Sequence, residues 1–243
     1  MNYERAVSDL VSFPIVFTTI VFLIGTITIT VITTLNDVRA GTESNVAEAT
    51  MRGYAETLSD HRTMSAPARS TTIKVQGHNF RRVSSTMGVA VLNSTGTRIQ
   101  MDSGTGALVR TTNTDTRLVY ESGGVFRLGE DGGAIVVRPP PVRCADGASA
   151  HLPLTLVRGD VNISADNRVT MESRLLEQDL RYPNNTSQNA SADTVTIDTS
   201  ELYATAGWNR TLDDWDNPSP NVYECDVERV VVHETTIEID PVT

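Results

Sequence analysis

A long apolar stretch runs from Leu10 to Leu35 and reads LVSFPIVFTTIVFLIGTITITVITTL. Its 26 positions hold no charged residue, and only nine residues precede it. A helix of this length rises about 39 Å, whereas the hydrocarbon core of a bilayer is about 30 Å thick. The stretch therefore predicts a transmembrane helix over residues 10–35.

The flanking sequence predicts that this helix is retained and that it continues. A secretory signal has an apolar segment of about 7–15 residues followed by a small-residue cleavage site, and this run is longer and lacks such a site. Beyond it, Arg39/Glu43 and Glu48/Arg52 are opposite charges four residues apart, which favours helix. We expect a short cytoplasmic leader over residues 1–6, then one helix over residues 7–61 whose part 36–61 is hydrophilic.

Two apolar stripes follow the hydrophilic continuation. One stripe consists of Leu35, Val38, Thr42, Val46 and Ala49. The other consists of Ala47, Met51, Tyr54 and Leu58, about 140° around the helix. Two stripes indicate two partners, the chain's own domain and a neighbouring subunit. One broad face against one domain is the alternative.

The rest of the chain is predicted to be rich in β-structure. Short β-prone runs separated by Gly-rich turns are 72–75, 88–92, 117–120, 134–137, 154–157, 229–232 and 236–239. Short strands at this spacing indicate a sandwich or a curled antiparallel sheet. Ser200 to Asp213 is expected to form a short helix. The predicted fold class is α+β: a long N-terminal transmembrane helix followed by an antiparallel β-rich head over residues 70–243.

Sequons and cysteines predict that this head is extracellular. Asn-x-Ser/Thr triplets, which accept glycans in exported proteins, begin at Asn93, Asn162, Asn184, Asn185, Asn189 and Asn209. Cys144 and Cys225, the only cysteines, suggest one disulfide in an exported domain. Two unpaired buried thiols are the alternative.

The charge balance excludes one class of partner. The formal net charge is −10, and Lys74 is the only lysine among 20 basic residues. An acidic, lysine-poor surface is typical of a salt-adapted source. Nucleic-acid binding requires a basic patch, so no nucleic-acid partner is expected.

The chain offers little catalytic chemistry. Asp102-Ser103-Gly104-Thr105 matches the turn of aspartic proteases, which need two carboxylates. A second copy of the turn is missing, so only a homodimer could supply the other carboxylate, and a hairpin turn is favoured. The sequence also lacks a nucleophile elbow, a phosphate loop and a metalloprotease histidine pair. We expect a non-enzymatic protein with no catalytic, cofactor or metal site.

The N-terminal sequence resembles a known class of proteins. Residues 5–11 (RAVSDLV), leading into the apolar run, look like the start of haloarchaeal type IV pilin-like proteins. Stretches that resemble an uncharacterised haloarchaeal membrane family of this type are 54–58, 66–72, 118–127 and 132–140. The resemblance implies cleavage by a prepilin peptidase between Ala6 and Val7, and assembly with other pilin-like subunits through the helix.

Departures from the pattern refine this expectation. Asp9, Pro14 and the large head differ from major pilins, which favours a minor pilin or pseudopilin. We therefore predict a pilin-like, glycosylated cell-surface filament subunit with one membrane span, a cytoplasmic N-terminus and an extracellular head. The alternatives are an uncleaved, membrane-anchored extracellular binding module and an anchored hydrolase that uses Asp102 in a homodimer.

Overall fold

The computed structural model describes residues 4–75, 79–112, 116–164, 168–183 and 190–242. In the first helix, the side chains of residues 4–12, 30, 32–37, 39 and 40 lie outside this description. The chain divides into two compact units, Met1–Asn45 and Val46–Thr243.

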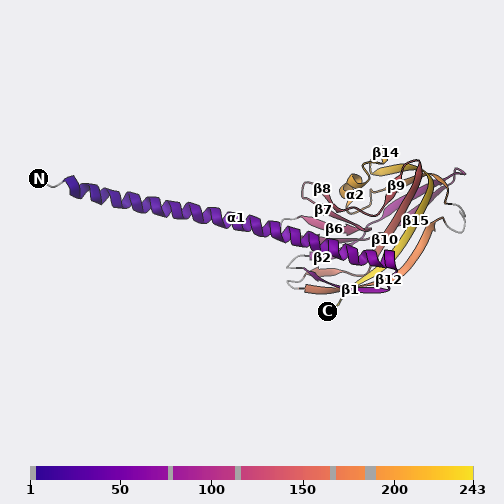
Figure 1. The fold of residues 1–243 in the computed structure, drawn as a ribbon, viewed down its shortest axis with the longest axis horizontal. Helices are drawn as coiled ribbons and strands as arrows, with labels where there is room; N and C mark the ends of the chain where they lie inside the picture. The colour runs from indigo at the N-terminus through magenta and orange to yellow at the C-terminus, as the bar shows by residue number, and fades with distance from the viewer. Residues whose placement is uncertain (1–3, 76–78, 113–115, 165–167, 184–189, 243) are drawn as a thin grey trace. The chain divides into compact units, whose positions relative to one another are not determined.

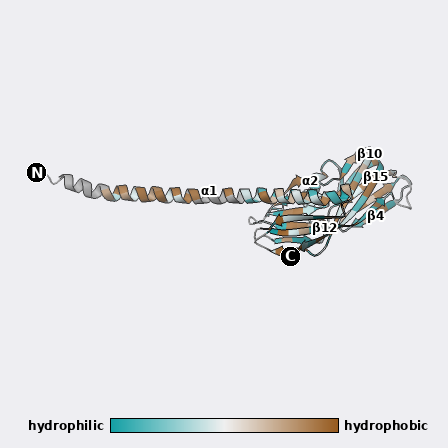
Figure 2. Cartoon of the chain, turned by 60° about the horizontal axis from the view of Figure 1, so that its bottom comes forward, coloured by the Kyte–Doolittle hydropathy of each residue, from teal (hydrophilic) through white to brown (hydrophobic). Residues whose placement is uncertain are grey.

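The longest element is the helix α1 (Glu4–Met64), shown in Figure 1, which begins in the first unit and ends in the second. In the first unit its threonines bond back to the preceding turn, as Thr18 Oγ1 does to the Pro14 carbonyl at 2.6 Å and Thr28 Oγ1 to the Ile24 carbonyl at 2.7 Å. These hydroxyls therefore need no outside acceptor. Figure 2 shows apolar residues gathered in this part of α1.

The membrane predictions require correction. No helix in the described part of the chain is long and apolar enough to cross a membrane. For the described residues, the predicted transmembrane helix over residues 10–35 is therefore wrong. The predicted single-pass localisation is wrong with it.

The predicted fold class is corrected accordingly. The described chain is mainly antiparallel β-sheet, because fifteen strands in two sheets form most of its core. The strands are β1 (Ala68–Lys74), β2 (Asn79–Val83), β3 (Met87–Asn93), β4 (Arg98–Ser103), β5 (Ala107–Thr111), β6 (Arg117–Glu121), β7 (Gly124–Leu128), β8 (Ala134–Arg138), β9 (Arg143–Ala145), β10 (Ala148–Arg158), β11 (Asn162–Ser164), β12 (Arg168–Tyr182), β13 (Ala192–Asp198), β14 (Asp216–Ser219) and β15 (Val222–Val242). The only other described helix is α2 (Thr205–Thr211).

The strands form two sheets in the second unit. The larger sheet has the order β1-β12-β15-β13-β3-β4, and β10, β9 and β14 join it around β15. The smaller sheet has the order β11-β2-β5-β6-β7-β8. Among the strands that the structure describes, every pairing is antiparallel except that of β10 with β15. The 21-residue β15 pairs with β12, β10, β13 and β14, so it organises the larger sheet.

The smaller sheet is buried on both faces, as its alternating residues show. Val109, Val119 and Phe126 belong to a core shared with the larger sheet and α2. Their neighbours, such as Leu108 and Leu118, belong to a second core with the last turns of α1. The period of two characteristic of strands thus supplies apolar side chains to two cores at once.

The last turns of α1 lie along these strands, as Figure 1 shows. One stripe of the helix is buried. Its side chains, each at most 2% exposed, are those of Ala47, Met51, Tyr54, Ala55 and Leu58. This stripe includes the predicted one that begins at Ala47. The described members of the other predicted stripe, Val38, Thr42, Val46 and Ala49, are exposed.

A buried histidine fastens the end of α1 to the larger sheet. His61 Nδ1–H donates to the Ala66 carbonyl, and its Nε2 lies 2.8 Å from Ser173 Oγ on β12. Gln178, also on β12, donates to the His61 carbonyl at 2.9 Å. These bonds satisfy polar groups at the helix end that would otherwise be buried without partners.

Candidate functional site

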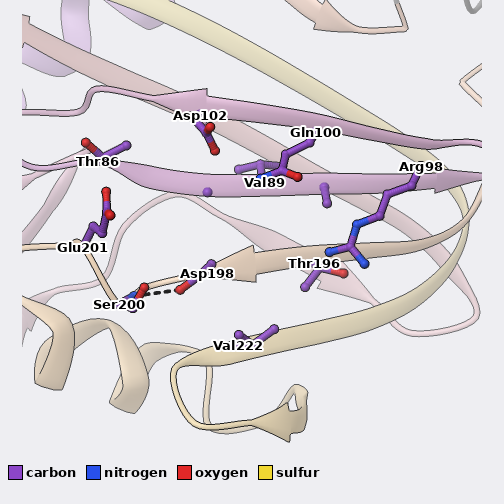
Figure 3. A pocket seen from close by; sticks show the side chains of 12 residues that line it. Thr86, Val89, Arg98, Gln100, Asp102, Thr196, Asp198, Ser200, Glu201 and Val222 are labelled. Carbon is purple, nitrogen blue, oxygen red and sulfur yellow. Dashed lines mark hydrogen bonds between the residues drawn. The ribbon is translucent and has the colours of Figure 1, made fainter.

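A groove of about 340 Å³ lies on the larger sheet, over β3 (Figure 3). Its floor is made by the small residues Gly88 and Ala90 of β3. Gly88 pairs with Asp102 on one side and with Asp198 on the other. Side chains of residues that pair across neighbouring strands project from the same face of a sheet. The long side chains of β4 and β13 therefore stand on both sides of β3, whose residues here have small side chains.

The next row of the sheet extends the groove. Ala90 pairs with Gln100 of β4 and with Thr196 of β13, so an amide and a hydroxyl face each other across a methyl group. Arg98 lies one row further along β4, and Figure 3 shows its side chain reaching toward Thr196. The walls are therefore polar, while the floor is small and apolar.

The two ends of the groove differ in charge. Asp102, Asp198 and Glu201 line one end, and Arg98 lines the other. Asp198 Oδ1 accepts the Ser200 backbone N–H at 2.9 Å, which fixes its carboxylate. The groove can thus offer hydrogen-bond acceptors to a cation at one end and a guanidinium to an anion at the other.

Hydrogen bonds join two segments that line the carboxylate end of the groove. The Thr86 N–H donates to the Glu201 carbonyl at 3.2 Å. Next to these residues in sequence, Ser85 Oγ and the Tyr203 N–H, the latter at 3.1 Å, donate to the buried Glu121. One carboxylate therefore ties together the two segments that carry Thr86 and Glu201.

Burial raises the pKa of Glu121 above the ordinary range of a glutamic acid. Hydrogen bonds to Ser85, Ala204, Tyr203 and Trp208 act in the opposite direction. Glu121 is buried and does not line the groove. Its role is to position the lining residues.

The predicted protease-like turn contributes one side chain to the groove. Asp102 is exposed near the end of β4, whereas Ser103 is buried and donates to Glu234. Asp198 of the same chain lies across Gly88 from Asp102, two strand spacings away or about 9–10 Å, whereas the two carboxylates of an aspartic protease share a proton. The motif thus indicated one residue of the groove. The small residues at positions 88 and 90 of a β-prone run were the missed signal.

The cysteine prediction is confirmed. Cys144 of β9 and Cys225 of β15 form a disulfide, with Cα atoms 6.5 Å apart and a sequence separation of 81. The bond ties the short β9 to the strand that organises the larger sheet. The alternative of two unpaired thiols is therefore wrong.

The sequons fall in different environments. Asn162 is exposed on β11, whereas Asn93 is half-buried and accepts the Thr97 N–H at 2.8 Å. Asn209 is half-buried in α2, where its Nδ2 donates to Asn221 Oδ1 at 2.8 Å. The other three predicted acceptors, Asn184, Asn185 and Asn189, lie outside the described residues.

The predicted cleavage site lies near the start of α1. Ala6 and Val7 lie within the bounds of α1, and their side chains are outside the described part. Among the residues described, no group of three or more His, Cys, Asp or Glu is arranged to hold a metal ion. The carboxylates of the groove are therefore not gathered around one metal position.

Comparison with known proteins places the chain in a family without assigning it an activity. No curated protein and no solved structure matches it. A family model described as a family of unknown function (DUF7289) matches residues 5–240. The match covers nearly the whole sequence, so the chain belongs to the DUF7289 family.

Proposed function

We propose that this protein is a non-enzymatic, type IV pilin-like assembly subunit whose α1 packs against α1 of further copies. The observation that carries the proposal is the exposure of the apolar part of α1. Twelve large apolar side chains between Phe13 and Val31 are each 49–73% exposed. They occur around the whole helix, and a helix that is apolar all round requires an apolar environment.

A second copy is an occupant that suits this surface. Residues 10–35 carry no charge, so identical helices can approach without electrostatic repulsion. The bonds of Thr18, Thr19 and Thr28 to carbonyls of their own helix remove hydroxyls that would otherwise need partners. An apolar surface on all sides accommodates more than one neighbour, and repeated contacts of this kind build open assemblies.

The end of α1 supports a structural role for the helix. Its buried stripe, from Ala47 to Leu58, packs in the core of its own chain. Val46 and Ala49, on the other stripe, remain exposed within the second unit. The helix therefore keeps apolar positions for contacts outside its own fold.

Sedimentation velocity of the full chain in mild detergent tests the proposal. We expect assemblies for the wild type and monomers for the double variant Ile20→Glu/Ile27→Glu, because buried unpaired carboxylates oppose helix packing. Asn45→Glu adds a charge at an exposed position of the same helix and should still assemble.

Disulfide crosslinking between copies of an Ile24→Cys variant, which carries an added thiol in the apolar part of α1, provides the second readout. Crosslinked dimers are expected at this position. A wild type that remains monomeric contradicts the proposal, as does a double variant that assembles equally well. Association of α1 with lipid vesicles alone, without any crosslink between copies, also contradicts it.

A further inference from the structure

We propose that the groove over β3 binds a short zwitterionic ligand of the amino-acid or small-peptide class. Its cationic group would lie between Asp102 and Asp198, and its anionic group at Arg98. This inference does not rest on the proposed assembly through α1. It rests on the shape of the groove, its charges and its neutral lining.

The size of the groove matches a small ligand. Its volume of about 340 Å³ lies at the lower end of the range for small-molecule sites. The row of Gly88 and the row of Ala90 are two residues apart on β3, which is about 7 Å along the strand. Arg98 itself belongs to the row of Leu92, about 13 Å from the row of Gly88, but its side chain reaches back toward Thr196 in the row of Ala90 (Figure 3). A peptide of two or three residues spans roughly 7–11 Å, so it can extend from the carboxylate end to the guanidinium of Arg98.

The charges at the ends are available to a ligand. Asp102, Glu201 and Arg98 form no ion pair with any residue that the structure describes. An ammonium group has three donors, and three carboxylates lie at this end. Because the described carboxylates are not arranged around a metal position, an organic cation suits them better than a metal ion.

The neutral lining suits the middle of a peptide. Gln100 offers two N–H donors and a carbonyl acceptor, and the Thr196 hydroxyl faces it across Ala90. Peptide groups need both donors and acceptors at close range. The low floor allows the ligand backbone to lie close to β3, where a larger residue would exclude it.

The floor itself gives a steric test. A Cβ atom added at Gly88 would lie 3.2 Å from the Asp198 Cβ and 3.8 Å from Asp102 Oδ1. Gly88→Val should therefore fill the space between the two carboxylates. A valine there retains every charge of the groove, so loss of binding in this variant reports shape rather than electrostatics.

Isothermal titration of the full chain with triglycine tests the proposal, and two blocked forms separate its charges. N-acetyl-triglycine lacks the cation and triglycinamide lacks the anion. We expect triglycine to bind, acetylation to weaken binding at least tenfold, and amidation to weaken it severalfold. Asp102→Asn/Asp198→Asn should weaken triglycine binding at least tenfold, whereas the matched control Asp214→Asn, at an exposed turn, should leave it unchanged.

Three outcomes overturn the proposal. They are the absence of measurable triglycine binding to the wild type, equal binding of the acetylated form, and equal binding by the Asp102→Asn/Asp198→Asn variant. Thermal melting confirms that each variant is folded. If Gly88→Val does not fold, the paired asparagine variant and the blocked peptides still decide the result.

Discussion

The indole Nε1 of Trp208 donates a hydrogen bond to the buried carboxylate of Glu121 over 3.0 Å. The same oxygen accepts the Ala204 N–H at 3.1 Å, at the start of α2. Glu121 ends β6, so one side chain connects the smaller sheet to α2 and to the segment that follows Glu201, a lining residue of the groove. A buried carboxylate that accepts several hydrogen bonds fixes the positions of the donors. Removing it leaves those buried donors unsatisfied, which costs free energy.

Replacing Glu121 with Gln should destabilise the protein by about 2–3 kcal/mol at neutral pH. The amide nitrogen would face N–H groups of Tyr203, Ala204 or Trp208, so at least one buried donor loses its acceptor. Chemical denaturation measures the change in unfolding free energy. Glu130→Gln, at an exposed position, is the matched control and should change the unfolding free energy by less than about 0.5 kcal/mol.

The free energy of unfolding should depend on pH through the protonation of Glu121. Because burial raises the pKa of Glu121 in the folded state, the folded protein binds this proton more tightly than the unfolded chain does. The contribution of Glu121 to stability is therefore complete below the ordinary pKa of a glutamic acid and falls as pH rises through the raised folded pKa. The difference between wild type and Glu121→Gln should shrink over this window. A difference that grows with pH contradicts the assignment.

Removing the disulfide should cost about 4 kcal/mol of stability in the chain-entropy description, because the bond closes a loop of 81 residues. Comparison of the wild type under oxidising and reducing conditions with Cys144→Ser/Cys225→Ser measures this cost. The double serine variant should melt at the same temperature with and without reductant. A wild type whose melting temperature does not respond to reductant contradicts the prediction.

Shortening a side chain on one stripe of α1 should change the free energy of unfolding more than shortening one on the other stripe. Leu58→Ala should destabilise the second unit by about 3 kcal/mol, because Leu58 is fully buried against the smaller sheet. Val46→Ala, at a position that is 39% exposed, should cost less than about 1 kcal/mol. Equal costs for the two variants in chemical denaturation would show that both stripes are packed within the chain.

These contrasts indicate how far the sequence determines the structure. The stripe from Ala47 to Leu58 could be predicted because helical periodicity places its members on one face. The runs 229–232 and 236–239 indicated strands correctly, but they belong to one strand, β15, since His233, Glu234 and Thr235 between them are not turn residues. Local pattern cannot reveal that β10 pairs with β15 in parallel, because that pairing depends on distant residues.

The residues of the groove likewise could not be predicted from local sequence. The protease-like motif points to Asp102 in the sequence. The other carboxylate that flanks Gly88 in the sheet, Asp198, is 96 positions away in sequence. Only the order β13-β3-β4 brings the two together across Gly88. Short motifs therefore identify single residues, whereas the site arises from strand order.

Glycan attachment should discriminate among the described sequons. Asn162 is exposed, whereas the Asn209 amide is half-buried and bonded to Asn221 and Thr199. Where the folded chain meets a glycan-transfer enzyme, we expect modification at Asn162 and none at Asn209. Mass spectrometry of glycopeptides, with Asn162→Gln as the control that removes the signal, checks this. Occupancy at Asn209 would contradict it.

Cleavage by a prepilin peptidase is the most direct test of the resemblance at the N-terminus. On co-expression with such an enzyme, mass spectrometry should find a chain that begins at Val7, because the small Ala6 precedes the expected scissile bond. Ala6→Asp places a charged, larger side chain next to that bond and should block the cut. Asn2→Asp, with the same added charge farther away, should be cut normally. A cut chain retains the whole apolar part of α1, from Leu10 to Leu35, for assembly. An intact Met1 under these conditions would instead separate this protein from pilin-like subunits, whatever its helices contact.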